Sequence, residues 1–276
     1  MPDLCNRLLL TVLPCLLAAS APAQSEQQPS SPAPALTPEE VRHALYTDVM
    51  TVPTPGEVFA AIDKGGKPNW SSQYRPPTSF NSISRAQVAL NLGTLIADGF
   101  IAVEAKDGQQ VKNIGRDVLT LAKKLSVSDS VLARSKSITQ FAEDGAWAQL
   151  DEELAATQNE VKQALEQNRD ADLITLVSVG GWIRGTEVVT GLLLQNYNAD
   201  DAKLLRQPAL VAYLKSKLGQ VNPKLRDDNV VGKVSQQLQA VEKMVNFPAD
   251  HVPSAEEVRS LNGLVANMTK EISNVQ

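Results

Sequence analysis

The stretch Leu173–Leu194, LITLVSVGGWIRGTEVVTGLLL, decides the fold class of this chain. It is the most apolar helical segment in the sequence and makes about six helical turns. Arg184 and Glu187 fall at its middle, where a lipid bilayer tolerates charge least, so a membrane span is disfavoured. A helix that is apolar on most sides is typical of the interior of a soluble helical protein. The segment therefore predicts an all-α fold with this helix at its centre.

A second long apolar helix is predicted for residues 84–105, because Val88, Leu92, Ile96 and Val103 recur at helical spacing. The same periodicity continues to the end of the chain. It predicts further helices at 108–125, 129–143, 146–168, 171–197, 200–219, 228–246 and 254–274. We therefore expect a multi-helix bundle of about nine to ten helices, with two long central helices.

The two long helices resemble one another. LNLGTLIADGFIAV, which starts at residue 90, aligns with VSVGGWIRGTEVV, which starts at residue 177, and this register pairs Gly93 with Gly180. With about six extra residues allowed, residues 121–132 then match residues 214–225. We interpret the pattern as an internal duplication, with repeats at about 84–168 and 171–247. Chance similarity between amphipathic helices is the alternative.

Small residues on these helices predict a close contact between them. Gly93 lies four residues from Ala89 and from Ala97, and Gly181 lies four residues from Gly185. A glycine in a helix interior costs about 1 kcal/mol relative to alanine. Close packing of two smooth helix faces would offset that loss. We expect the two long helices to cross at their glycines.

The N-terminus predicts export. Residues 1–23 have Arg7 near the start, an apolar run and Ala21-Pro22-Ala23, which is typical of a signal peptide cleaved near Ala23. Both cysteines lie within this segment, so the mature chain would contain none. Residues 24–36 are rich in Pro, Ser and Gln and predict a flexible linker. The expected location is periplasmic or extracellular.

The remaining residues, 37–276, are interpreted as one all-helical domain. Thr37 begins a helix-start signal, and Thr54 begins a second one. Residues 64–82 contain several glycines and prolines that exclude a helix, with aromatic residues between them. We interpret this strap as a cover for one face of the bundle, with a ligand lid as the alternative. Helix 254–274 carries a narrow apolar stripe that either packs across the bundle or pairs with another chain.

Charges within the two long helices mark the candidate site. Asp98 is mid-helix in the first copy, and Arg184 and Glu187 are mid-helix in the second. If the helices cross at their glycines, Asp98 comes near Arg184. Such charges either pair for structural reasons or line a polar cavity. The ligand-binding candidates are Asp98, Trp182, Arg184, Glu187, Trp70 and Tyr74.

Other classes of function find little support. The net charge is −5 and no basic cluster is present, so nucleic acid is not an expected partner. His43 and His251 are far apart in sequence, and no zinc-binding spacing occurs. We therefore expect no metal, no cofactor, no catalytic residue and no membrane span in the mature chain.

Three hypotheses remain. The first is a non-catalytic binding or interaction protein, with a small-ligand site between the central helices and beneath the strap. The second is an enzyme that uses Glu187 or Asp98 as a general base. The third is a structural protein that forms homo-oligomers through residues 254–274.

Overall fold

The computed structural model describes residues 52–63, 67–76 and 80–274, and within these ranges every regular element is helical. The predicted all-α bundle is confirmed. The predicted signal peptide, the linker, and the helix expected from Thr37 lie outside the described residues. The helices are α2 (Pro55–Asp63), α3 (Arg85–Glu104), α4 (Gly108–Lys124), α5 (Ser128–Asp144), α6 (Trp147–Gln167), α7 (Ala171–Gln195), α8 (Ala199–Ala202), α9 (Pro208–Gln220), α10 (Pro223–Arg226), α11 (Asn229–Val245) and α12 (Ala255–Ser273), with 3-10 turns at Trp70–Gln73 and Lys203–Leu205.

Side-chain caps set where several helices begin. The hydroxyl of Ser84 accepts from Gln87 N at the start of α3, and Asp107 accepts from Gln110 N at the start of α4. Ser254 and Glu257 form a complete capping box on α12, as their spacing predicts. These groups satisfy backbone N–H groups that have no partner within the helix.

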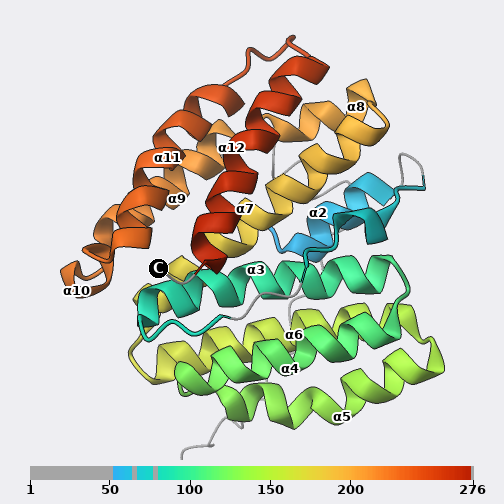
Figure 1. Cartoon of the computed structure of the whole chain (residues 1–276), viewed down its shortest axis with the longest axis vertical. Helices are drawn as coiled ribbons and strands as arrows, with labels where there is room; N and C mark the ends of the chain where they lie inside the picture. Colours follow the sequence, from blue (N-terminus) through green and yellow to red (C-terminus); the bar gives the residue numbers. More distant parts are fainter. Residues whose placement is uncertain (1–51, 64–66, 77–79, 275–276) are drawn as a thin grey trace, which may run out of the picture. The chain divides into compact units, whose positions relative to one another are not determined.

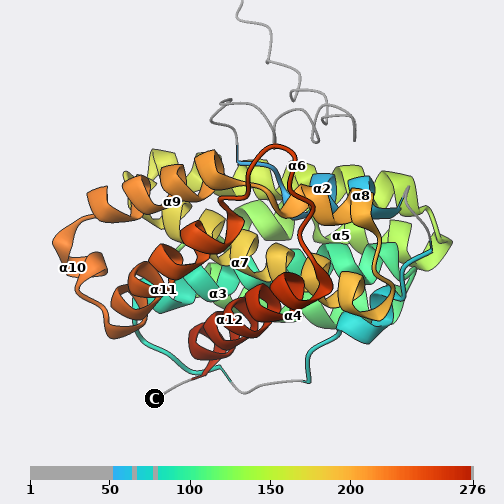
Figure 2. The same ribbon diagram turned by 90° about the horizontal axis from the view of Figure 1, so that it is seen from above.

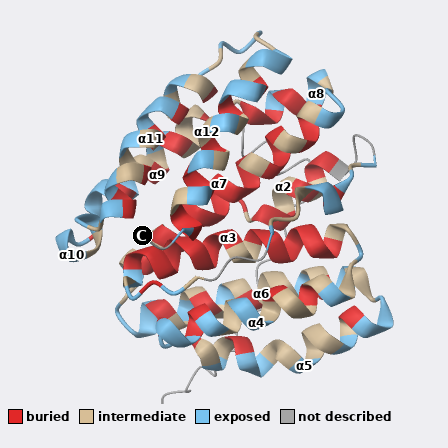
Figure 3. Cartoon of the chain, viewed as in Figure 1, coloured by how far each residue is buried: buried red, intermediate tan, exposed pale blue. Residues whose placement is uncertain are grey.

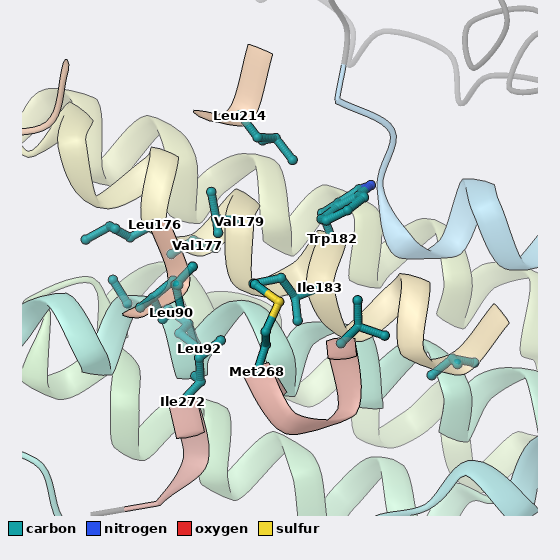
Figure 4. Packing of buried hydrophobic residues seen from close by; sticks show 14 of the residues in the cluster. Leu90, Leu92, Leu176, Val177, Val179, Trp182, Ile183, Leu214, Met268 and Ile272 are labelled. Carbon is teal, nitrogen blue, oxygen red and sulfur yellow. The ribbon is translucent and has the colours of Figure 1, made fainter. Parts of the chain in front are cut away.

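α3 and α7 bury most of their residues, whereas the helices around them are buried on one side (Figure 3). By length and composition α3 could also cross a membrane, but nearly all of its apolar window is buried inside the protein, as in the core helix of a soluble bundle. Leu90 and Leu92 of α3 pack beside Val177 of α7, and Met268 and Ile272 of α12 complete this part of the core (Figure 4).

α3 and α7 meet at two glycines. A Cβ atom built on Gly93 would lie 2.0 Å from the carbonyl oxygen of Val177, and one built on Gly180 would lie 2.0 Å from that of Leu90. Only glycine permits backbones this close. The predicted crossing is confirmed, with one correction. Gly181 does lie at the crossing, since its backbone N is 2.7 Å from a Cβ built on Gly93, but the α7 residue that has no room for a side chain is Gly180. A Cβ on Gly181 would meet nothing nearer than 3.4 Å, and one on Gly185 would meet nothing within 4 Å.

The other helices flank this crossing. α4 and α6 pack on α3, and α5 packs against α4 and α6; α9 and α12 pack on α7, and α11 packs against α9 and α12 (Figures 1 and 2). The α12 stripe is buried within the chain itself. Val258, Leu261, Val265, Met268 and Ile272 are each 0 or 1% exposed, because α12 packs on α7 and α11. This stripe therefore packs across the bundle, which is the first of the two alternatives.

Two predicted segments differ from the structure. The helix expected at 200–219 is broken into α8, a 3-10 turn and α9, because Pro208 lacks an N–H and cannot continue a helix. Gln207 before it has non-helical backbone angles, φ −131° and ψ 46°, and occupies the N-cap position of α9 without a side-chain capping bond. In the strap, the prolines and glycines do not exclude every turn: Trp70–Gln73 form a 3-10 helix between them.

Candidate functional site

The structure brings the three mid-helix charges together. The Arg184 Nε donates to Asp98 Oδ1 at 2.8 Å across the helix crossing. Its Nη1 lies 3.0 Å from Glu187 Oε2, one turn further along α7. The approach of Asp98 to Arg184, which the crossing predicts, is confirmed.

The strap supplies a second guanidinium that the sequence analysis missed. Arg75 Nε donates to Asp98 Oδ2 at 3.0 Å, so Asp98 is held between Arg75 and Arg184. Arg184 also donates to the backbone carbonyl of Gln73. The two arginines therefore fasten the strap to both long helices. We call Arg75, Asp98, Arg184 and Glu187 the charge cluster.

A charge count could have predicted a second cation here, although not that Arg75 supplies it. Asp98 and Glu187 carry two negative charges, and Arg184 carries only one positive charge. Buried charge that is not balanced is costly, so a second cation was needed. With Arg75 the charge cluster is neutral.

Hydrogen bonds extend the charge cluster to α12. Arg75 Nη1 donates to Ser273 Oγ at 2.8 Å, and Ser273 Oγ donates to Asn91 Oδ1 at 3.2 Å. Arg75 Nη2 donates to Thr94 Oγ1 at 3.2 Å. The charge cluster thus joins the strap, α3, α7 and the end of α12 in one network.

The Arg184 side chain is only 2% exposed. Burial acts to lower its pKa, but the negative charges of Asp98 and Glu187 outweigh burial, so the net shift of the Arg184 pKa is upward. Arg184 therefore remains a cation inside the protein, and its charge is balanced by contacts within the chain.

The aromatic candidates do not converge on the charge cluster. Trp182 Nε1 donates to Gln207 Oε1 at 2.8 Å, toward the start of α9. Trp70 is buried against Phe59, with ring centroids 5.2 Å apart. The Tyr74 hydroxyl donates to Asp107 Oδ2 at 3.4 Å, and burial, followed by the charge of Asp107, raises its pKa.

An apolar pocket lies elsewhere, among α3, α4, α5 and α6. It has a volume of about 70 Å³ and is lined mainly by apolar side chains, including Leu92, Ile96, Ile114, Val131, Leu154 and Val161. Gln158 also lines it, and the Oε1 atom of this residue is buried without a hydrogen-bond partner among the residues the structure describes. The sequence pattern gave no signal for this pocket, because its residues are ordinary apolar positions on amphipathic helices.

A smaller pocket of about 20 Å³ adjoins the first one and shares Ile96 and Gln158 with it. It lies beside the glycine crossing, next to Gly93, Gly181 and Trp182. Lys162 of α6 lines it, and burial lowers the pKa of Lys162, although Glu57 and Glu166 oppose that shift. Of the six candidate residues, Trp182 alone contributes to either pocket.

The lowered pKa of Lys162 predicts how the stability of the chain depends on pH. The pKa of Lys162 is lower in the folded chain than the ordinary 10.5. Between the folded-state pKa and 10.5, Lys162 is therefore protonated more often in the unfolded chain than in the folded chain. Stability of the wild-type chain should therefore rise with pH across this window, and Lys162→Met should remove that rise. Urea denaturation of both proteins at a series of pH values up to 10.5 measures the effect. Parallel profiles would contradict the assignment.

Neither a search for metal-ligand clusters nor a comparison with known proteins identifies the function of the site. Within residues 52–63, 67–76 and 80–274 no three His, Cys, Asp or Glu side chains cluster as metal ligands. No protein-family model matches the chain, and neither a curated protein nor a solved structure shows significant similarity to it.

Proposed function

We propose that this chain is a non-catalytic binding protein that holds a small molecule with an apolar group. The observation that supports this is the pocket of about 70 Å³, where Gln158 Oε1 is a buried acceptor without a partner in the described part of the chain. A buried acceptor that lacks a hydrogen bond costs about 1–3 kcal/mol. A ligand that donates an O–H or N–H group to it would recover that energy.

The pocket suits a short alkyl group. Apolar cavities of roughly 150 Å³ stay free of water and bind benzene, and this pocket has about half that volume. Its walls come from four helices, which is typical of ligand sites in helical bundles. The ligand would then place its apolar end among these helices and its donor group near Gln158.

The charge cluster favours binding over catalysis. A general base needs a free lone pair aimed at its substrate. Both Asp98 oxygens accept hydrogen bonds from guanidinium groups. Glu187 Oε2 has no well-aligned hydrogen bond within the described residues, but it lies 3.0 Å from Arg184 Nη1, so its negative charge is already paired with that guanidinium. We therefore assign these charges to holding the strap in place, rather than to the general-base chemistry of an enzyme.

We also infer that the domain arose by duplication of a helical unit around a central pair of helices, α3 and α7. The alignment that pairs Leu90 with Val177 and Gly93 with Gly180 is reciprocal in space, because Gly93 contacts Val177 and Gly180 contacts Leu90. A pseudo-twofold axis produces such exchanged contacts. The arrangement of the other helices supports the same inference, since α4 and α6 pack on α3 with α5 against both of them, while α9 packs on α7 with α11 against α9.

The proposed compartment is the periplasm or the exterior, and it rests on the N-terminal sequence alone. Homo-oligomerisation through α12 has less support than ligand binding, because the apolar stripe of α12 is already covered by α7 and α11.

A cavity-filling variant tests the proposed function. A Cβ on Gly99 would meet Ile114 and Leu154, both in the pocket wall, at 3.9 Å, which is ordinary contact. Gly99→Ala should raise the free energy of unfolding by about 1 kcal/mol through helix propensity. It should also remove room for about one methylene of ligand, which lowers affinity about fourfold. Thermal shift with a series of n-alkanols measures both effects.

Gly263→Ala is the matched control, because Gly263 is an exposed helical residue with nothing within 4 Å of an added Cβ. It changes helix propensity equally and leaves the pocket unaltered. If the alkanols stabilise both variants to the same extent, the binding site is not this pocket. If they stabilise neither the variants nor the wild type, the proposed function is wrong.

A further inference from the structure

The two adjoining pockets differ in chemistry. The larger one is apolar, whereas the smaller one holds Lys162 and Ser178 beside the indole of Trp182. Gln158 stands in the wall that both pockets share. A ligand that extends from the first pocket into the second would meet apolar side chains first, then the Gln158 amide, and then the Lys162 ammonium.

Lys162 has no direct partner in the described part of the chain. It is one turn after Gln158 on the same face of α6, and it forms no ion pair or hydrogen bond with any residue that the structure describes. Among the described residues that line either pocket, it is the one charged side chain. A half-buried ammonium without a counter-ion lowers stability, and a bound anion would supply that counter-ion.

The fields of nearby carboxylates do not replace a direct partner. Glu57 of α2 and Glu166 of α6 both act on Lys162, yet neither lies within ion-pair distance of its Nζ. Within residues 52–63, 67–76 and 80–274 no carboxylate therefore forms a direct ion pair with Lys162, and a bound anion would supply one. The smaller pocket is the space beside it where such a group can enter.

We propose that the ligand is a short-chain alkyl carboxylate, with its alkyl group in the larger pocket and its carboxylate on Lys162 Nζ in the smaller one. This rests on the proposed function and specifies its ligand class. A hydroxyl group on the alkyl chain of the ligand would donate the hydrogen bond that Gln158 Oε1 lacks within the described residues. A hydroxy acid therefore matches the apolar wall with its alkyl group, Gln158 with its hydroxyl and Lys162 with its carboxylate.

The test compares ligands of equal length. Pentanoate, 1-pentanol and pentylamine are titrated into the full chain, and dissociation constants are measured by NMR chemical shifts. Pentanoate should bind about tenfold more tightly than pentylamine, which carries the wrong charge for Lys162. A 3-hydroxypentanoate should bind a further threefold or so more tightly than pentanoate, through Gln158.

Lys162→Met keeps the aliphatic stem and removes the charge. It should lower pentanoate affinity about tenfold and change 1-pentanol affinity by less than about twofold. Lys224→Met is the matched control, because Lys224 is exposed at the start of α10 and lines neither pocket. This control should bind pentanoate as the wild type does.

The outcomes separate the two proposals. If 1-pentanol binds and Lys162→Met leaves pentanoate affinity unchanged, the carboxylate assignment is wrong and the apolar pocket stands. If Lys162→Met and Lys224→Met weaken pentanoate equally, the effect is one of net charge and again opposes the assignment. If no probe binds the wild type, the proposed function itself fails.

Discussion

Replacing Gly93 or Gly180 with alanine is expected to lower the free energy of unfolding by about 3 kcal/mol or more. Each added Cβ would lie 2.0 Å from a backbone carbonyl oxygen of the other long helix. A flexible side chain could move aside, but a carbonyl in a helix cannot, so α3 and α7 must separate. Overpacking typically costs about 1–3 kcal/mol, and a backbone clash belongs at or above the upper end. Denaturant unfolding measures the loss.

Gly181→Ala is the matched control for this prediction. It is the neighbouring residue of the same helix, yet its Cβ would meet Gly93 O at 3.4 Å, which is ordinary contact. It should leave stability unchanged or raise it, because alanine is the better helix former. Equal stability of all three alanine variants would show that α3 and α7 do not touch at Gly93 and Gly180.

Replacing Arg184 with methionine is expected to destabilise the chain by about 3–5 kcal/mol, the usual effect of removing one partner from a buried ion pair. The side chain is 2% exposed, and its removal leaves Asp98 paired with Arg75 alone and takes from Glu187 the guanidinium that it pairs with. The strap would also lose the bond from Arg184 to the Gln73 carbonyl. Protease cleavage between Trp70 and Arg75 should therefore become faster.

Arg85→Met is the control, because Arg85 pairs with Asp170 on the surface, and its side chain is 46% exposed. Exposed pairs contribute about 1 kcal/mol or less. The double variant Arg184→Met with Glu187→Gln restores neutrality and should recover part of the lost stability. If Arg184→Met lowers the free energy of unfolding no more than Arg85→Met does, the charge cluster does not stabilise the fold.

Helix positions were largely predictable because they depend on neighbours in the chain. The 3.6-residue spacing of apolar residues located α3 and α7, and the Ser254 and Glu257 capping box located the start of α12. The single helix predicted at residues 200–219 was wrong, although Pro208, whose missing N–H favours a helix start at that position, is also a local signal.

The site was predictable only in part. Asp98 and Arg184 could be paired in advance, because glycines on both helices predicted where they cross. Arg75 could not be placed, since the strap has no periodicity that says which residue faces inward. Gln158 and Lys162 look like ordinary polar residues of an amphipathic helix. Only the packing of α6 beside the crossing reveals that, among the described residues, Gln158 Oε1 has no hydrogen-bond partner and that Lys162 lines a pocket.

The sequence by itself determined the all-α class, the boundaries of the long helices and the presence of charge within them, because apolar periodicity, caps and glycine spacing act over one or two turns. Tertiary structure decided which α7 glycine has no room for a side chain against α3, that Arg75 completes the charge cluster, and that two pockets meet at Gln158. These features depend on how helices far apart in the chain are rotated against one another. That rotation follows from the packing of the whole core, which no local pattern encodes.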